Sequence, residues 1–366
     1  MGKSAKKSKN FVMAYGVKDE ESDLEPMKIK RRKVESFDVR IEILYCGVCH
    51  SDYHHIKNDW QDSIYPMVPG HEIIGKVVEI GDNVTSVEIG DNVAVGNMLD
   101  SCRQCKSCQK ANEQYCLNGG PTWTYNSKER VNGNERYLYP EGEATYGGYS
   151  ANIICTEPFV FKLPPNMDLA TSAPLLCAGI TVYYPLKHYK IGKGHKVGIA
   201  GIGGLGHLGV KIAKAMGAEV IALTRTPWKL KDADRLGADD AILMTDTSDV
   251  NRYKDQLDFI IDTIPDPHEL KPYLGLLSPG EGKLHVVGNM QEFPKLKGKS
   301  FVWYGRDITG SNVGGTHDTL EMLNFCQKND IYADIELIDI QDINDSMITM
   351  LNSQVKYRFV IDMSSL

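Results

Sequence analysis

Four cysteines gathered in one short stretch carry the strongest chemical signal in the chain. Gaps of two, two and seven residues separate them, at Cys102, Cys105, Cys108 and Cys116. A structural zinc ion prefers four such soft ligands, and two-residue gaps let one loop wrap around a single ion. Runs of this kind also hold iron–sulfur clusters, although no proline follows the last cysteine here. The spacing favours structural zinc and leaves the cluster open as the alternative.

A second group could bind a metal and leave one coordination position open. The segment Cys46-Gly47-Val48-Cys49-His50-Ser51-Asp52 precedes Gly70-His71-Glu72 by about twenty residues. Two cysteines and one histidine leave zinc a fourth position for water or an alcohol, whose pKa the metal lowers toward neutrality. This arrangement indicates chemistry on an alcohol or a carbonyl group.

A glycine-rich loop connects a short apolar strand to a helix. Residues 196–200 predict the strand, and the helix is expected over 208–216. The glycines of such a loop allow a tight turn and let a pyrophosphate approach the helix N-terminus. The loop that we expect to bind a dinucleotide consists of Gly201, Ile202, Gly203, Gly204, Leu205 and Gly206.

The residues at the end of the next predicted strand, 220–223, indicate which dinucleotide is bound. Enzymes that use NAD usually carry an acidic residue there, which binds the ribose hydroxyls. Residues 222–229 contain no acid but include Thr224, Arg225 and Lys229. A hydroxyl and two cations suit a 2′-phosphate, so the sequence favours NADP(H) over NAD(H).

The predicted pattern of secondary structure changes near Leu163-Pro164-Pro165. Before this point, short alternating strands broken by Gly, Asp and Asn predict a β-rich domain with partly open barrel character. After it, strands alternate with helical patterns, which predicts a parallel sheet. We expect residues 1–163 and 316–366 to form the first domain and 164–315 the second. Strands are expected at 39–44, 76–80, 93–95, 220–223, 241–243, 259–261, 283–287 and 358–361.

Composition excludes several classes of protein. The 366 residues, 42% hydrophobic and 24% charged, suffice for two packed cores, and a net charge of −7 argues against a dedicated nucleic-acid binder. The basic segment 1–10 lacks the apolar core of a signal peptide, so we expect a disordered tail. Nine cysteines without such a signal argue against disulfides and favour the cytoplasm. The uncharged run 169–186 is expected to be a buried, turn-rich segment rather than a membrane helix.

The pattern Gly70-His71-Glu72-x2-Gly75-x5-Gly81-x2-Val84 resembles the signature of the zinc-containing alcohol dehydrogenases, within the medium-chain dehydrogenase/reductase superfamily. The four-cysteine loop and Cys177-Ala178-Gly179-Ile180-Thr181 belong to the same family pattern. The resemblance implies an α/β chain, with a GroES-like β-rich catalytic domain and a Rossmann domain built on a doubly wound parallel sheet.

The resemblance also implies roles for individual residues. Zinc ligands are expected at Cys49, His71 and Cys177, with Glu72 close to the metal and sometimes a ligand. Asp52 would orient the ligating histidine, as metal-bound imidazoles generally require. Ser51 would contact the reacting oxygen and begin a proton relay, which His54 would pass to solvent. Further cofactor contacts are expected at His50, Thr181, Thr263, Gly288, Asn312 and Val313.

Several stretches resemble the cinnamyl alcohol dehydrogenase branch, including Tyr65-Pro66-Met67-Val68-Pro69-Gly70 and Val355-x-Tyr357-Arg358-Phe359-Val360. This branch implies homodimers that reduce aldehydes with NADPH, so we expect aromatic, cinnamyl-type or medium-chain substrates. The chain departs from the branch at Arg225, at Gly315, where serine is usual, and at Trp60-Gln61-Asp62. The alternatives are an NAD-linked alcohol or polyol dehydrogenase, and a non-catalytic protein that binds zinc and nucleotide. We expect no nucleic-acid or membrane partner.

Overall fold

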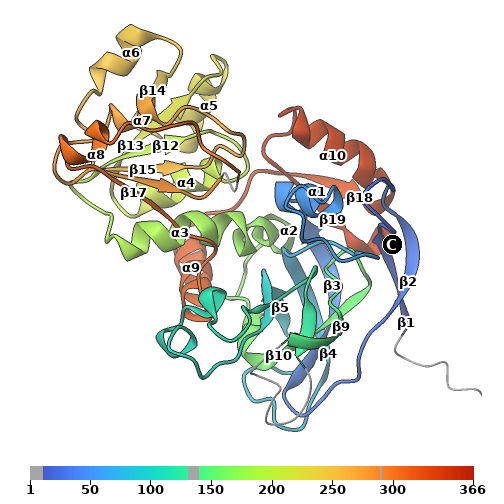
Figure 1. Ribbon diagram of the computed structural model, residues 1–366. Coiled ribbons are helices and arrows are strands. Elements are labelled where there is room, and N and C mark those ends of the chain that lie inside the picture. The colour runs from blue at the N-terminus through green and yellow to red at the C-terminus, as the bar shows by residue number, and fades with distance from the viewer. Residues whose placement is uncertain (1–10, 131–139, 289–290) are drawn as a thin grey trace, which may run out of the picture. The chain divides into compact units, whose positions relative to one another are not determined.

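The computed structural model describes residues 11–130, 140–288 and 291–366, so the tail expected at 1–10 lies outside the described residues. The chain divides into two compact units (Figure 1). The first comprises residues up to 177 together with 315–323 and 334–366, and the second comprises 178–314 and 324–333.

The first boundary between the units lies after residue 177, whereas the sequence pattern predicted it after residue 163. Residues 164–177 group with the first unit because the short helix η4 (Ala173–Leu176) packs on strands β3, β4, β5 and β19 of its sheet. All four residues of η4 are buried there. The boundary therefore falls after Cys177, and the apolar composition of η4 explains why it joins the nearer core.

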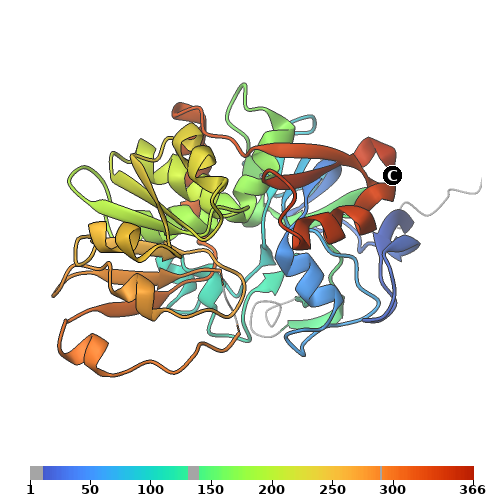
Figure 2. The same ribbon diagram turned by 90° about the horizontal axis from the view of Figure 1, so that it is seen from above.

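A seven-stranded sheet forms the centre of the first unit. Its strands follow the order β11-β5-β4-β3-β19-β18, and β10 also pairs with β3. Strand β19 runs antiparallel to β3, and Figures 1 and 2 show these red and blue strands side by side. Residues from both ends of the chain thus complete one sheet. Its strands are β3 (Asp38–Gly47), β4 (Ile73–Ile80), β5 (Asn92–Val95), β10 (Asn152–Thr156), β11 (Phe161–Lys162), β18 (Ile335–Asp339) and β19 (Arg358–Asp362).

Smaller elements surround this sheet and bury its core, in which Ile41, Tyr149 and Phe159 are inaccessible to solvent. Three antiparallel pairs are β1 (Phe11–Gly16) with β2 (Glu25–Lys30), β6 (Met98–Asp100) with β7 (Thr122–Trp123), and β8 (Lys128–Arg130) with β9 (Pro140–Ala144). The helices are α1 (His50–Ile56), α2 (Leu169–Ser172) and α10 (Ile343–Leu351), with short 3-10 turns η1 (Cys108–Lys110), η2 (Glu113–Tyr115), η3 (Glu157–Phe159), η5 (Ile340–Asp342) and η6 (Met363–Ser365).

A six-stranded parallel sheet forms the centre of the second unit. Its order, β14-β13-β12-β15-β16-β17, is the 3-2-1-4-5-6 order of a Rossmann sheet, which places the ligand site outside the carboxyl ends of β12 and β15. Residues 197–200 are wholly buried, as expected of a strand with both faces covered. The strands are β12 (Lys196–Ala200), β13 (Glu219–Thr224), β14 (Asp240–Leu243), β15 (Phe259–Asp262), β16 (Lys283–Val286) and β17 (Asp307–Gly310).

Helices connect these strands and supply the cover. They are α3 (Ala178–His188), α4 (Gly206–Ala215), α5 (Lys229–Leu236), α6 (Thr247–Arg252), α7 (Lys271–Leu274) and α8 (Lys299–Val302). Helix α9 (Thr316–Lys328) begins in the first unit and ends in the second.

The uncharged run 169–186 is buried, as expected, but the predicted turns are wrong. It folds into α2, η4 and most of α3, because its prolines stand near the start of η4 or within α3 without ending it. Among the described residues, no single helix is long and apolar enough to cross a membrane. The segments 169–176 and 178–188 pass that test only as a bent pair, by length and composition.

Candidate active site

Strand β3 and helix α1 meet at the first candidate zinc ligand. Cys49 directly precedes α1, and its backbone N–H donates to Asp52 Oδ2 at 3.0 Å, which satisfies an amide that the helix start leaves open. Gly47 ends β3 at a point where any Cβ would overlap the Glu72 carboxylate. The local sequence therefore brings Cys49 and Glu72 close together.

The Asp52 carboxylate organises this region from a fully buried position. Besides the Cys49 amide, it accepts hydrogen bonds from Gly70 N at 3.1 Å and from the Tyr149 hydroxyl at 3.2 Å. Its Oδ1 also lies 3.1 Å from His71 Nδ1. This contact fixes the imidazole ring and leaves His71 Nε2 buried without a hydrogen-bond partner within the described residues.

Four candidate ligands converge at this point. One ligand atom from each of Cys49, His71, Glu72 and Cys177 lies within 4.8 Å of the others. The Sγ atoms of Cys49 and Cys177 are 3.9 Å apart, close to the roughly 3.8 Å that two thiolates span around a tetrahedral zinc ion. The unpartnered His71 Nε2 and this sulfur spacing both fit zinc.

The charges around the cluster favour a bound cation. A hydrogen bond with Cys177 lowers the pKa of Cys49 well below its usual value, and the positive charge of Arg358 acts in the same direction against burial. Burial would lower the pKa of His71, but the charge and hydrogen bond of Asp52 outweigh it and raise that pKa to about 10. The Cys49 thiolate is the ligand form that zinc requires, and a zinc ion that binds here must displace the proton from His71 Nε2.

Glu72 forms a buried ion pair with Arg358 of β19. Both side chains are almost completely excluded from solvent, so each charge needs the other. Sequence reasoning placed Glu72 at the metal but assigned no role to Arg358, which is far away in the chain. Their pairing shows how the Glu72 carboxylate is held beside the cluster.

The two residues of the expected proton relay lie one helical turn apart on α1. Ser51 Oγ is 3.6 Å from Cys49 Sγ, which places the hydroxyl at the candidate metal site. His54 Nδ1 lies 2.7 Å from Asp59 Oδ2 and its ring packs near Trp60. No hydrogen bond joins Ser51 to His54 among the residues that the structure describes, so the relay stays a prediction.

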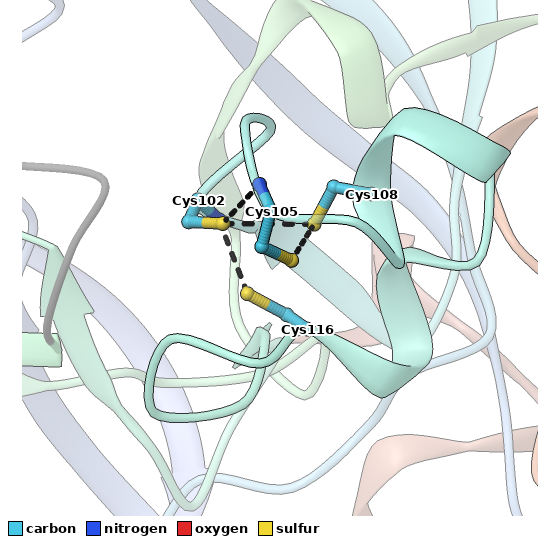
Figure 3. A group of neighbouring side chains, drawn as sticks. All are labelled: Cys102, Cys105, Cys108 and Cys116. Carbon is cyan, nitrogen blue, oxygen red and sulfur yellow. Dashed lines mark hydrogen bonds between the residues drawn. The ribbon is translucent and has the colours of Figure 1, made fainter.

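The four-cysteine loop gathers its sulfur atoms around one point (Figure 3). Cys108 Sγ lies 3.8 Å from Cys102 Sγ and 3.5 Å from Cys105 Sγ. Partial burial would raise the pKa of Cys105, but backbone amides of Cys108 and Leu117 outweigh it and lower that pKa to about 6. All four sulfur atoms lie within 4.8 Å of one another, whereas an iron–sulfur cluster divides its four thiolates between two or more irons, so this arrangement fits a single ion.

The glycine loop adopts the conformation that the fingerprint requires. Gly201 has a φ of +84°, and a Cβ at Gly206 would overlap the Gly201 carbonyl oxygen. A Cβ at Gly203 would meet no protein atom within 4 Å, so the space beside it is open to a ligand. The Thr263 hydroxyl lies 2.8 Å from the carbonyl oxygens of Ala200 and Gly201 and ties β15 to this turn.

The residues expected to choose the cofactor lie at the carboxyl end of β13. Arg225 is exposed, and the described residues give its guanidinium no hydrogen bond or ion pair. The Thr224 hydroxyl accepts a hydrogen bond from Thr226 N at 3.1 Å, and the Lys229 ammonium lies 5.4 Å from the centre of the Trp228 ring.

The remaining expected cofactor contacts are distributed between the two units. Thr181 is buried in α3, and a Cβ at Gly288 would overlap the backbone of residues 263–264. Asn312 and Val313 follow β17, whereas His50, the first residue of α1, belongs to the first unit.

Comparison with known families accounts for this combination of sites. Residues 35–165 match the alcohol dehydrogenase GroES-like domain, and residues 204–328 match the zinc-binding dehydrogenase domain. A probable zinc-type alcohol dehydrogenase-like protein of Acanthamoeba polyphaga mimivirus is 44% identical over 97% of this chain and 82% of its own length. The chain belongs to the zinc-containing alcohol dehydrogenase family. The resemblance, the GroES-like and Rossmann folds and the oxidoreductase class are thereby confirmed, and the zinc-binding family supports zinc over an iron–sulfur cluster.

Other members of this alcohol dehydrogenase family match nearly the whole chain. The mannitol dehydrogenase of Apium graveolens is 43% identical, covering 97% of this chain and 94% of its own length. Aldehyde reductase YahK of Escherichia coli is 43% identical, with 96% and 98% covered.

Two solved structures of cinnamyl alcohol dehydrogenases have the same fold. The Sorghum bicolor enzyme has a TM-score of 0.89 at 36% identity and covers 97% of this chain and 98% of its own. The Helicobacter pylori enzyme, solved in complex with NADP(H), has a TM-score of 0.88 at 40% identity, with 97% and 99% covered.

Proposed function

We propose that this alcohol dehydrogenase reduces aldehydes to primary alcohols with NADPH, on aromatic, cinnamyl-type or medium-chain substrates. The observation that carries the proposal is the pair of sites in one chain: a cluster of thiolates and imidazole, and an exposed Arg225 in place of an acidic residue. The Helicobacter pylori relative complexed with NADP(H) and the relative named aldehyde reductase support it.

The residues of the two metal sites and of helix α1 have different proposed roles. Cys49, His71 and Cys177 would hold zinc, with Glu72 beside them, and a second zinc would be held by Cys102, Cys105, Cys108 and Cys116. When bound, catalytic zinc supplies Lewis acidity to the reacting oxygen, and the dinucleotide supplies the hydride. Asp52 fixes the His71 ring, and Ser51 donates the proton that an aldehyde oxygen needs on reduction. His54, paired with Asp59, is placed to resupply that proton.

Oxidation of a polyol with NAD is the second candidate, favoured by the relative named mannitol dehydrogenase. The two functions differ in cofactor and in substrate, so steady-state kinetics separates them. The assay uses aliphatic, aromatic and hydroxycinnamyl aldehydes with NADPH or NADH, and mannitol with NADP or NAD. A higher kcat/KM for aldehydes with NADPH supports the proposal, and a higher value for mannitol with NAD would overturn it.

We also propose a homodimer in the cytoplasm. Strand β17 is an edge of the parallel sheet, and the segment before it exposes Val302, Trp303 and Tyr304. Exposed apolar side chains beside a strand edge are typical of a surface that a partner covers. All nine cysteines are free thiols, as a reducing compartment allows.

A further inference from the structure

The segment Ser311–Gly315, here the crossover segment, follows β17 and ends where the chain returns to the first unit. The carboxyl ends of parallel strands share one edge, so this segment begins at the edge that receives the dinucleotide. Arg225 follows β13, which assigns the 2′-phosphate and the adenosine to the half formed by β12–β14. The half formed by β15–β17 is left for the nicotinamide. This assignment rests on the proposed function.

A buried histidine holds the beginning of the crossover segment. His285 on β16 lies with Nδ1 2.8 Å from Thr309 Oγ1 of β17 and with Nε2 2.8 Å from Ser311 Oγ. Its imidazole is 2% exposed and packs against the rings of Tyr189 and Phe259. One ring nitrogen thus forms a hydrogen bond with the edge strand, and the other forms one with the first residue of the crossover segment.

A buried carboxylate holds the end of the crossover segment. Glu113, in η2 of the four-cysteine loop, accepts hydrogen bonds from Thr316 N at 3.1 Å and from Thr316 Oγ1 at 3.2 Å. Gly315 approaches the same loop so closely that a Cβ would overlap the Ala111 carbonyl oxygen. This approach explains the glycine at a position where the resembling branch usually has serine.

We propose that His285 and Glu113 are positioning residues that hold the two ends of the crossover segment, each within its own unit, in the conformation that receives the nicotinamide half of the cofactor. Each anchor restricts the residues next to it within its own unit, so these residues have less conformational freedom left to lose when a ligand binds. If either anchor is removed, binding must first order the segment, and affinity falls. Both residues act through Ser311 and Thr316.

The test compares the whole cofactor with a fragment that lacks nicotinamide. The dissociation constants of NADPH and of 2′-phospho-ADP-ribose are measured by titration calorimetry on the wild type, His285→Leu and Glu113→Ala. We expect the NADPH constant to rise about five- to tenfold in both variants, and the fragment's constant to change less than about twofold. His285→Gln, which can still donate and accept, should recover most of the affinity.

Matched controls remove similar groups elsewhere. His195→Leu changes a histidine at the amino edge of the same sheet, whose side chain hydrogen-bonds only with Gly192 among the described residues. Glu157→Ala removes a carboxylate that binds the amides of Thr85 and Ser86. Neither should alter either constant. Melting temperature and zinc content identify variants that do not fold, for which His285→Met, which also removes both hydrogen bonds, and Glu113→Gln serve as milder replacements.

Unchanged NADPH affinity, or an equal loss for NADPH and the fragment, would overturn the inference. A wild type that binds NADH but not NADPH would instead refute the proposed cofactor. In that case, the dissociation constants of NADH and ADP-ribose for the same variants test whether His285 and Glu113 hold the crossover segment.

Discussion

The Ser51 hydroxyl lies beside the thiolate cluster, where a reacting oxygen would need a proton donor. Ser51→Ala should lower kcat about 100-fold, the lower end of what positioned proton transfer contributes, because water must then supply the proton. The dissociation constant of NADPH should stay within about twofold, since the role proposed for Ser51 is proton transfer and not cofactor binding. Stopped-flow reduction of an aromatic aldehyde and fluorescence titration measure the two quantities. A fully active variant would show that Ser51 is not the donor.

Arg225 carries the proposed choice between the two dinucleotides. Arg225→Asp should weaken NADPH binding about tenfold or more and move the preference toward NADH, because a charge-assisted hydrogen bond contributes roughly 1.5–3 kcal/mol. The measurement is the ratio of kcat/KM for NADPH to that for NADH in both proteins. Retained preference for NADPH would mean that other groups hold the 2′-phosphate.

At the scale of elements, the two cysteine groups should fail in different ways. Cys105→Ser removes a ligand from a closed loop whose fold depends on its metal, so it should lose one zinc and lower the melting temperature by about 5 °C or more. Cys177→Ser should mainly abolish turnover. Elemental analysis, calorimetry and an activity assay distinguish the two outcomes. An active, well-folded wild type that holds one zinc ion or none would contradict the prediction.

The sheet of the second unit should weaken in acid through His285. Burial, and secondarily His188, lower its pKa to about 4 from an ordinary value of 6.5. The unfolded chain therefore takes up this proton first, and stability is lost as the pH falls from about 6.5 to 4. The loss between pH 7.5 and 4.5 should be roughly 2–3 kcal/mol smaller in His285→Gln than in the wild type. Urea unfolding at both pH values measures it, and equal losses would contradict it.

The sequence predicted those features that residues close together in the chain determine by themselves. The strand at 196–200 agrees with β12, and the four-cysteine spacing identified a metal group that the structure brings together. Contacts between distant segments left no such signal. Arg358 reaches Glu72 because β19 pairs with β3, and Tyr149 reaches Asp52 because β10, which begins three residues after it, pairs with β3 as well. Strands β17 and β18 were missed because neither shows a regular apolar alternation.

At the scale of the whole molecule, the exposed Trp303 offers a test of self-association. It is 75% exposed, and Val302 beside it is 89% exposed. If a second copy covers this surface, Trp303→Glu should shift sedimentation from dimer to monomer, because a carboxylate would be buried without a partner. The far-UV circular dichroism spectrum should stay unchanged, because each protomer keeps its fold, whereas the melting temperature falls with the loss of the partner. A wild type that sediments as a monomer would overturn the proposed dimer.

The pairing of β19 with β3 also sets an order of events during synthesis of the chain. Strands β18 and β19 are synthesised after all six strands of the parallel sheet. The second unit therefore has all of its strands at a time when the sheet of the first unit still lacks two. Until Arg358 arrives, the Glu72 carboxylate has no buried cation and must remain hydrated. Metal loading at Cys49, His71 and Cys177 is therefore expected to follow the synthesis and pairing of β19, late enough for the finished pocket to select its ion.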